Sequence, residues 1–273
     1  MDKYLIMTDL DGTLLNKKSK LTKKSIRYLR FLEKKGHYVI LSTGRPYQGC
    51  INFYNQIGLT SPLVCDNGGS IHFPNDHSKD IFTTIPLDLF IDFVKEIRFY
   101  IFSAMSSHFD IVYYYNKPYV PHYIQHNSIP RPIDEGFLDE IVKKPPINPT
   151  FFIKEADFDK VLNVLKKEKY SSIIEYRFWK SGNNTFSLEL FNKEATKGHA
   201  LTKLKNLLNI NFENDLVFGD QMNDVEMLQT ANNSVAMKNG KELLKKISKY
   251  TTYKTNDRNG VIHFIKKFFK NIK

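Results

Sequence analysis

The sequence is poor in cysteine, with only Cys50 and Cys65 among its 273 residues. Their spacing does not match a metal-binding cysteine motif, and we expect no structural disulfide. Cys65 ends a short apolar run, so we predict that it is a buried thiol. This use of cysteine indicates a cytoplasmic protein.

The sequence also lacks a long hydrophobic run. No segment approaches the roughly 20 apolar residues that a helix needs to cross a membrane, so we expect no membrane span. Met1-Asp2-Lys3 leads directly into an apolar strand, and we therefore expect no signal peptide. Hydrophobic residues make up 41% of the chain, enough for the core of one large domain or two medium ones.

Acidic residues are outnumbered, and the formal net charge is +11. Residues 241–273 hold ten of the basic residues and only two acids. Apolar residues recur there at helical spacing, namely Val261, Phe264, Ile265, Phe268 and Ile272. We favour a terminal helix docked on a sheet, but an amphipathic helix at a membrane surface has the same pattern. No segment has the signature of a nucleic-acid-binding module, so no nucleic-acid partner is expected.

The acids that are present gather where apolar runs end. Residues 4–8 form a short apolar run that continues into Asp9-Leu10-Asp11-Gly12-Thr13. Two carboxylates at this spacing leave a strand on the same side and repel each other unless a cation or a shared proton relieves them. They suit Mg²⁺, with one carboxylate placed to attack an electrophile. A simple hairpin turn at Asp11-Gly12 is the alternative, and this motif alone does not decide between the two.

A second acidic segment follows the apolar residues 216–218. It contains Asp220, Asn223 and Asp224. Ligands of open parallel sheets bind beyond the carboxyl ends of the strands, so the two acidic segments can share one site. A turn at Asp220 or a helix cap at Asn223 or Asp224 would explain one of these residues, but not all three.

Two further segments suit an anionic ligand. Ser42-Thr43-Gly44-Arg45 follows a predicted strand and offers a hydroxyl and backbone N–H groups at a turn. Lys197 stands at the start of a helical pattern, where the helix dipole disfavours a cation unless it faces a phosphate or an aspartate. The alternatives are an ordinary capped turn and a solvated lysine.

Together these four segments resemble those of the haloacid dehalogenase-like hydrolases, and within them the Cof-type phosphatase branch with a type IIB cap. Weaker similarities lie at residues 66–69 and 259–261, and Lys238 departs from the small residue usual in the branch. The resemblance implies a Mg²⁺-dependent phosphatase of small phosphorylated metabolites such as sugar phosphates. A phosphosugar mutase and a non-enzymatic protein that senses phosphometabolites or binds a membrane surface remain as alternatives.

The resemblance also implies roles for individual residues. Asp9 would attack phosphorus and form an aspartyl-phosphate, and Asp11 would act as general acid and then as general base. Lys197 would be the third catalytic residue. The other implied roles are phosphate binding by Thr43, Gly44, Lys197 and Asn223, Mg²⁺ binding by Asp9, the backbone carbonyl of Asp11 and Asp220, and support of the site by Asp224.

The order of the predicted elements indicates two kinds of sheet. Strands at 4–8, 37–41 and 63–65 alternate with helices at 22–35 and 47–57, which predicts a parallel sheet. The segment that follows predicts helices on one side of a mostly antiparallel sheet, with strands at 111–115, 150–153, 173–178 and 186–191 and helices at 87–99 and 157–167.

We therefore predict an α/β fold in which an α+β cap is inserted into a Rossmann-like core with a parallel sheet. The core would comprise residues 1–84 and 192–273, and the cap residues 85–191. The resemblance assigns substrate specificity to the cap. Its aromatic run at 113–122 either stacks on a substrate ring or serves in packing. The sequence does not indicate an oligomeric state.

Overall fold

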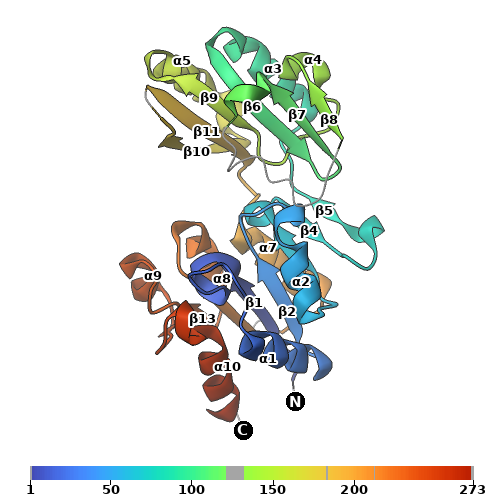
Figure 1. Ribbon diagram of the computed structural model, residues 1–273, viewed down its shortest axis with the longest axis vertical. Coiled ribbons are helices and arrows are strands. Elements are labelled where there is room, and N and C mark those ends of the chain that lie inside the picture. Colours follow the sequence, from blue (N-terminus) through green and yellow to red (C-terminus); the bar gives the residue numbers. More distant parts are fainter. Residues whose placement is uncertain (1, 121–131, 183, 212, 272–273) are drawn as a thin grey trace. The chain divides into compact units, whose positions relative to one another are not determined.

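The computed structural model describes residues 2–120, 132–182, 184–211 and 213–271. It divides into two compact units (Figure 1), one formed by Met1–Ile81 with Thr196–Lys273 and the other by Phe82–Ala195. The chain thus leaves the first unit once and returns to it once. The two units are described separately below.

The first unit contains an eight-stranded sheet with the order β14-β13-β12-β1-β2-β3-β4-β5. Its six parallel strands are β1 (Leu5–Asp9), β2 (Tyr38–Ser42), β3 (Leu63–Cys65), β12 (Asp215–Gly219), β13 (Ser234–Ala236) and β14 (Tyr250–Thr251). β4 (Ser70–His72) is antiparallel to β3, and β5 (Ile81–Phe82) forms the edge. β1 lies in the middle, and consecutive strands continue outward on both sides of it.

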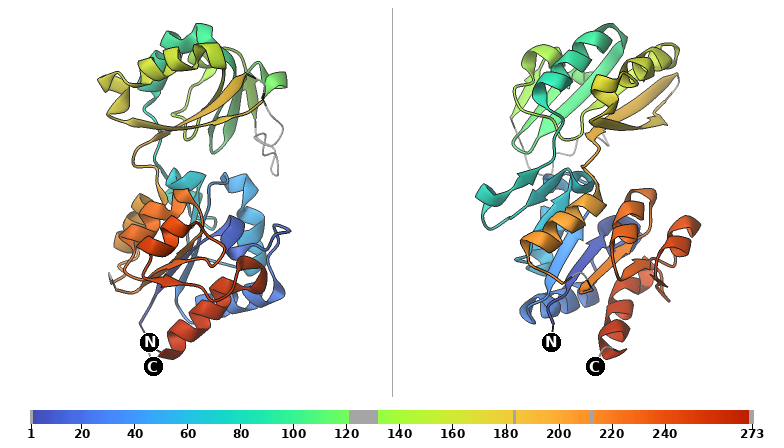
Figure 2. Two further views of the ribbon diagram at one scale, coloured as in Figure 1. Left: turned by 90° about the vertical axis from the view of Figure 1, so that its left-hand side faces the viewer. Right: turned by 180° about the vertical axis from the view of Figure 1, so that it is seen from behind.

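Helices cover both faces of this sheet (Figure 2), as expected for a doubly wound fold. One layer consists of α1 (Lys23–Lys34), α2 (Ile51–Ile57) and α10 (Gly260–Asn271). The other consists of α7 (Lys197–Leu207), α8 (Val225–Thr230) and α9 (Glu242–Ile247). Because both faces are covered, all five residues of β1 are buried.

Local signals in the sequence set the bounds of α1. The hydroxyl of Thr22 accepts a hydrogen bond from the backbone N–H of Ser25 and caps the first turn. Gly36, just past the end, has a φ of +88°, a left-handed conformation that glycine adopts without strain. The predicted helix at 22–35 is confirmed to within a residue at each end.

The basic C-terminal segment is a docked helix. Val261, Ile262 and Ile265 of α10 are fully buried in the core cluster that also contains α1 and α2. The docked interpretation is therefore confirmed for the residues that the structure describes, which do not include Ile272. No helix in the described part of the chain is long and apolar enough to cross a membrane.

The second unit contains a six-stranded sheet with the order β10-β11-β9-β6-β7-β8. Its strands are β6 (Ile101–His108), β7 (Ile111–Tyr115), β8 (Ile133–Glu135), β9 (Thr150–Lys154), β10 (Ile174–Lys180) and β11 (Thr185–Asn192). Neighbours are antiparallel except β7 and β8. The main core cluster joins this sheet to the helices α3 (Leu87–Ile97), α4 (Leu138–Ile141), α5 (Glu155–Leu165) and α6 (Glu168–Ser171). The predicted α/β fold class is thereby confirmed.

The structure answers two points of detail in this unit. The central strand β6 was not predicted, because serines interrupt its apolar residues. Ser103 and Ser106 are nevertheless fully buried.

Tyr113 and Tyr114 of the aromatic run are buried too, so these two residues serve in packing. Residues 121 and 122 of the run lie outside the described residues.

The docking of α10 gives a first prediction. Ile265→Ala should lower the free energy of unfolding by about 2–5 kcal/mol, because it removes a fully buried side chain from the core. Lys270→Ala, on the exposed side of the same helix, should change it by less than about 0.5 kcal/mol. Urea denaturation of both variants measures the difference. Equal losses would contradict the docked helix.

Candidate active site

The sequence motifs meet where three neighbouring strands of the first sheet end, at their carboxyl ends. Asp9 ends the central strand β1 and is 5% exposed. β2 and β12 flank β1, so that Asp9 lies beside Ser42 and Thr8 beside Phe218. Parallel strands place their carboxyl ends together, and this register brings the segments that follow β1, β2 and β12 to the same edge.

A sharp turn after β1 brings the chain against Asp220. Gly12 in this turn has a φ of +80°, and a Cβ atom there would lie 2.3 Å from Oδ2 of Asp220. The hydroxyl of Thr13 donates to Oδ1 of Asp220 at 2.8 Å. The amide of Asn239 donates to the Gly12 carbonyl at 2.7 Å. Only glycine satisfies both the backbone conformation and the close approach.

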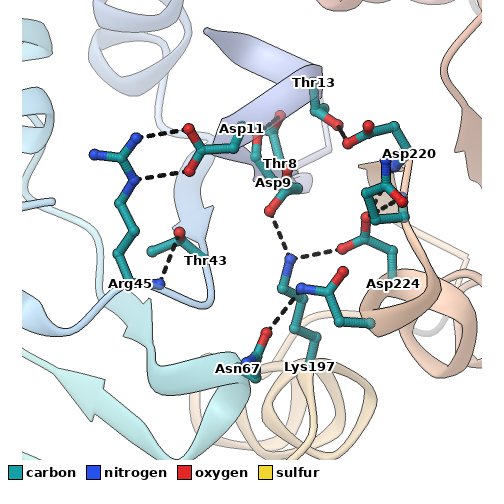
Figure 3. Close-up of polar contacts among 12 residues, drawn as sticks. Thr8, Asp9, Asp11, Thr13, Thr43, Arg45, Asn67, Lys197, Asp220 and Asp224 are labelled. Carbon is teal, nitrogen blue, oxygen red and sulfur yellow. Dashed lines mark hydrogen bonds and ion pairs between the residues drawn. The ribbon is translucent and has the colours of Figure 1, made fainter. Parts of the chain in front are cut away.

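Lys197 joins two acids in the interior of the site (Figure 3). Its Nζ lies 2.6 Å from Oδ1 of Asp9 and 2.6 Å from Oδ1 of Asp224. The ammonium is fully buried. It stands in the first turn of α7, where the helix dipole alone would disfavour it, and the two carboxylates compensate.

Asp224 is the most fully engaged of the acids. Its Oδ1 accepts from Lys197, and its Oδ2 accepts from the backbone N–H groups of Asp220 (2.8 Å) and Gln221 (3.1 Å). Asp224 therefore fixes both the lysine and the segment after β12. This arrangement suits a supporting residue.

The charges within the site do not balance. One carboxylate oxygen from each of Asp9, Asp220 and Asp224 lies within 4.8 Å of the others, and Lys197 contacts only Asp9 and Asp224 among the three. Burial raises the pKa of Asp9; Lys197 opposes this rise and the other two acids add to it. Burial also raises the pKa of Asp220 to about 6. Burial lowers the pKa of Lys197, but Asp9 and Asp224 more than offset this, so that its pKa is raised overall.

This imbalance is what a hard divalent cation would correct. The donors are carboxylate oxygens, which Mg²⁺ prefers over nitrogen or sulfur ligands. Crowded acids with raised pKa values are stabilised when a cation shares them. The residues present therefore fit a magnesium ion.

Asp11 lies on the outer side of the same turn. Its carboxylate forms a two-pronged ion pair with Arg45, with Nε and Nη2 at 2.7 and 2.6 Å from its oxygens. The Asp11 side chain is half exposed. Asp9 and Asp11 thus leave the turn toward different partners, Lys197 inside and Arg45 outside (Figure 3).

The remaining predicted residues surround the end of β2. The hydroxyl oxygen of Thr43 accepts from the backbone N–H of Arg45 at 3.1 Å. Asn223 donates to the side-chain oxygen of Asn67 at 2.8 Å. A Cβ atom on Gly44 would lie 2.9 Å from that same oxygen. Asn67 therefore connects the segments after β2, β3 and β12.

The structure brings Asp9, Lys197, Asp220 and Asp224 into direct contact or close approach. It also reveals four further residues of the site for which no role was predicted, namely Thr13, Arg45, Asn67 and Asn239. Thr13 and Arg45 lie inside the recognised motifs, and Asn67 lies in a segment of weaker similarity. Only Asn239, next to the atypical Lys238, carries no local signal.

Comparison with known proteins gives a consistent family. The family model described as haloacid dehalogenase-like hydrolase matches residues 6–265. The 5-amino-6-(5-phospho-D-ribitylamino)uracil phosphatase YitU of Bacillus subtilis is 32% identical, with 97% of each chain covered. The phosphatase YwpJ of the same organism is 27% identical, with 96% of this chain and 98% of YwpJ covered. The crystal structure of TM0651 from Thermotoga maritima is similar, with a TM-score of 0.79, 26% identity and 97% of each chain covered.

The buried ammonium gives the prediction for this site. Lys197→Met should destabilise the fold by about 3–5 kcal/mol, because it leaves Asp9 and Asp224 buried without their cation. Lys238→Met removes an exposed lysine and should have an effect below about 0.5 kcal/mol. Chemical denaturation in EDTA compares the two. An exposed salt bridge contributes less than about 1 kcal/mol to the free energy of unfolding. A loss that small for Lys197→Met would contradict the buried contact of Lys197 with Asp9 and Asp224.

Proposed function

The chain belongs to the haloacid dehalogenase-like hydrolases and is a phosphatase of that family, and we propose that it hydrolyses small phosphorylated metabolites with Mg²⁺ through an aspartyl-phosphate on Asp9. One observation carries the proposal. Asp9 ends the central strand with its carboxylate held by Lys197, beside Asp220 and Asp224. A carboxylate at the end of a strand, a cation and further acids are thus grouped in one buried place, which supports the proposal.

Asp9, Asp220 and the backbone carbonyl of Asp11 would hold the magnesium ion. When bound, Mg²⁺ neutralises the charge that otherwise keeps a carboxylate from approaching a phosphate dianion. One oxygen of Asp224 accepts from Lys197 and the other accepts from the backbone of Asp220. Asp224 would thereby hold both residues in position.

Asp9 would act as the nucleophile. Lys197 orients its carboxylate through Oδ1 and contributes positive charge beside the transferring group. An oxygen of Asp9 bonds to phosphorus while the bond from phosphorus to the leaving alcohol breaks. Thr43 accepts a hydrogen bond through Oγ1, so its own hydroxyl proton can be donated to a phosphate oxygen. Gly44 and Asn223 complete the proposed phosphate site.

Asp11 would transfer the protons. It gives a proton to the departing alcohol and then takes one from the water that attacks the aspartyl-phosphate, which releases phosphate and restores Asp9. In the structure Arg45 holds the Asp11 carboxylate by two contacts. Arg45 would therefore aim Asp11, and the pair must loosen when Asp11 carries the proton.

The names of the relatives support a proposal for the substrate class. YitU is named for a phosphoribityl compound, and YwpJ is named a phosphatase. We propose a sugar or sugar-alcohol phosphate as substrate, with residues 85–191 as the cap that selects it. The names of these relatives favour release of phosphate over the isomerisation that a mutase would perform. A phosphate-release screen should include 5-amino-6-(5-phospho-D-ribitylamino)uracil.

Replacing the nucleophile tests the proposal most directly. Asp9→Asn should reduce phosphate release to the background rate, because an amide does not attack phosphorus, and EDTA should do the same to the unaltered protein. Asp2→Asn, which precedes the other end of β1, is the control and should keep full activity. Hydrolysis that survives Asp9→Asn would exclude Asp9 as the nucleophile.

Replacing Asp11 separates the two half-reactions. Asp11→Asn should lower turnover by about 10²- to 10⁴-fold. With p-nitrophenyl phosphate, whose leaving group needs no proton, the variant should give a burst of nitrophenolate and a phosphate adduct on Asp9 detectable by mass spectrometry. A steady slow rate without burst or adduct would place Asp11 outside the second step.

Gly12 tests the geometry of the turn. Gly12→Ala should reduce activity by about 100-fold or more, because the new methyl group displaces the carboxylate of Asp220. Gly36→Ala is a matched control, since Gly36 also has a positive φ, but a Cβ atom there would have no neighbour within 4 Å among the described residues. It should lose about 1 kcal/mol of stability and keep its activity. Equal activity of the two variants would contradict the role of the close approach.

A further inference from the structure

A second group of metal-type ligands lies on the β4–β5 hairpin of the first unit (Figure 1). Oδ2 of Asp80 is 2.7 Å from Nδ1 of His72 and 2.9 Å from Nδ1 of His77. The side chains of His72 and Asp80 are almost fully buried, whereas the side chain of His77 is 43% exposed. None of these residues belongs to the motifs that define the candidate active site.

The hydrogen bonds around His72 fix which of its nitrogens carries a proton. The Ser70 hydroxyl donates its single proton to Oδ2 of Asp66 at 2.7 Å. Ser70 Oγ also lies 2.9 Å from Nε2 of His72, and toward that nitrogen it can only accept. Nε2 of His72 therefore carries a proton.

In neutral His72 the lone pair of Nδ1 then points at a carboxylate oxygen. The other oxygen of Asp80 already accepts the backbone N–H of Phe73 at 2.7 Å. Nδ1 of His72 and Oδ2 of Asp80, 2.7 Å apart, need a positive centre between them, which either a proton or a metal ion supplies. A second imidazole nitrogen, from His77, faces the same oxygen.

We propose that His72, His77 and Asp80 bind a divalent transition-metal ion, with Zn²⁺ as the best match. Two imidazole nitrogens and one carboxylate oxygen form a zinc ligand set that leaves a fourth position open. Nitrogen ligands also distinguish this site from the all-oxygen set around Asp9, which suits Mg²⁺. The chain would thus bind Mg²⁺ and Zn²⁺ at separate sites, because the ligand atoms of the two sites differ.

The geometry needs only a small adjustment. Bonds of about 2.0–2.1 Å in a tetrahedron place ligand atoms roughly 3.3 Å apart, slightly more than the 2.7 and 2.9 Å found here. The half-exposed His77 can rotate outward, whereas the buried side chains of His72 and Asp80 would have to separate by about 0.6 Å. The chain from His72 through Ser70 to Asp66 resembles the outer hydrogen bonds that orient metal-binding histidines.

The position of the site suggests what the ion would do. It would tie β4 to the segment before β5, at the edge of the sheet. Through Ser70 it would also steady Asp66, whose neighbour Asn67 connects three segments of the candidate active site. The ion would therefore act as a structural clamp, with water rather than a fourth side chain completing its ligands.

Calorimetric titration of the full chain with Zn²⁺, in excess Mg²⁺ to occupy the oxygen ligands, tests the proposal. We expect one Zn²⁺ per chain for the unaltered protein and at least about tenfold weaker binding for His77→Ala and Asp80→Asn. Ser70→Ala should weaken binding by about 10- to 100-fold through the orientation of His72. His199→Ala is the matched control, because His199 is 48% exposed and also pairs with an acid, Glu226.

The outcomes are distinct. A thermal stabilisation by Zn²⁺ that His199→Ala keeps and His77→Ala loses would support the clamp. Absence of Zn²⁺ binding by the unaltered protein, or equal binding by His77→Ala, would overturn it. Because the readout is metal binding, neither result depends on the activity proposed above.

Discussion

The whole site depends on one buried ammonium. Lys197 lies between Asp9 and Asp224, and without it two carboxylates from distant parts of the chain would repel each other in a medium that screens charge poorly. Asp224 in turn holds the backbone after β12, and Asp220 meets the turn after β1. The lysine therefore sets the positions of both acidic segments. An interaction of this kind costs stability unless every partner is in place, which explains the dense hydrogen bonding around it.

Much of this arrangement could be predicted from the sequence. Alternating strands and helices predicted the parallel sheet, and the parallel sheet predicted that segments following β1, β2 and β12 would meet. Acids at the ends of apolar runs then singled out Asp9 and Asp220. The site was predictable because its chemistry is concentrated where strands end, and strand ends are visible as changes from apolar to polar residues.

What could not be predicted depends on three-dimensional contacts. The pairing of Asp11 with Arg45 joins residues 34 positions apart, and that of Asn67 with Asn223 joins residues 156 apart. Asn239 reaches Gly12 from a loop with no motif of its own. The strand β6 was missed for a different reason, since Ser103 and Ser106 are buried polar residues that break the apolar pattern. In each case the sequence shows the residue but not its environment.

The insertion point of the second unit has an evolutionary consequence. Every side chain of the candidate site precedes Phe82 or follows Ala195, and Lys197 is the second residue of the returning segment, which begins at Thr196. A lineage could therefore exchange the intervening module for another and inherit the reaction machinery intact. Such an exchange would have to keep the position of Lys197 in α7. Moving the lysine by one residue along the helix would rotate it by about 100° and turn it away from its two acids.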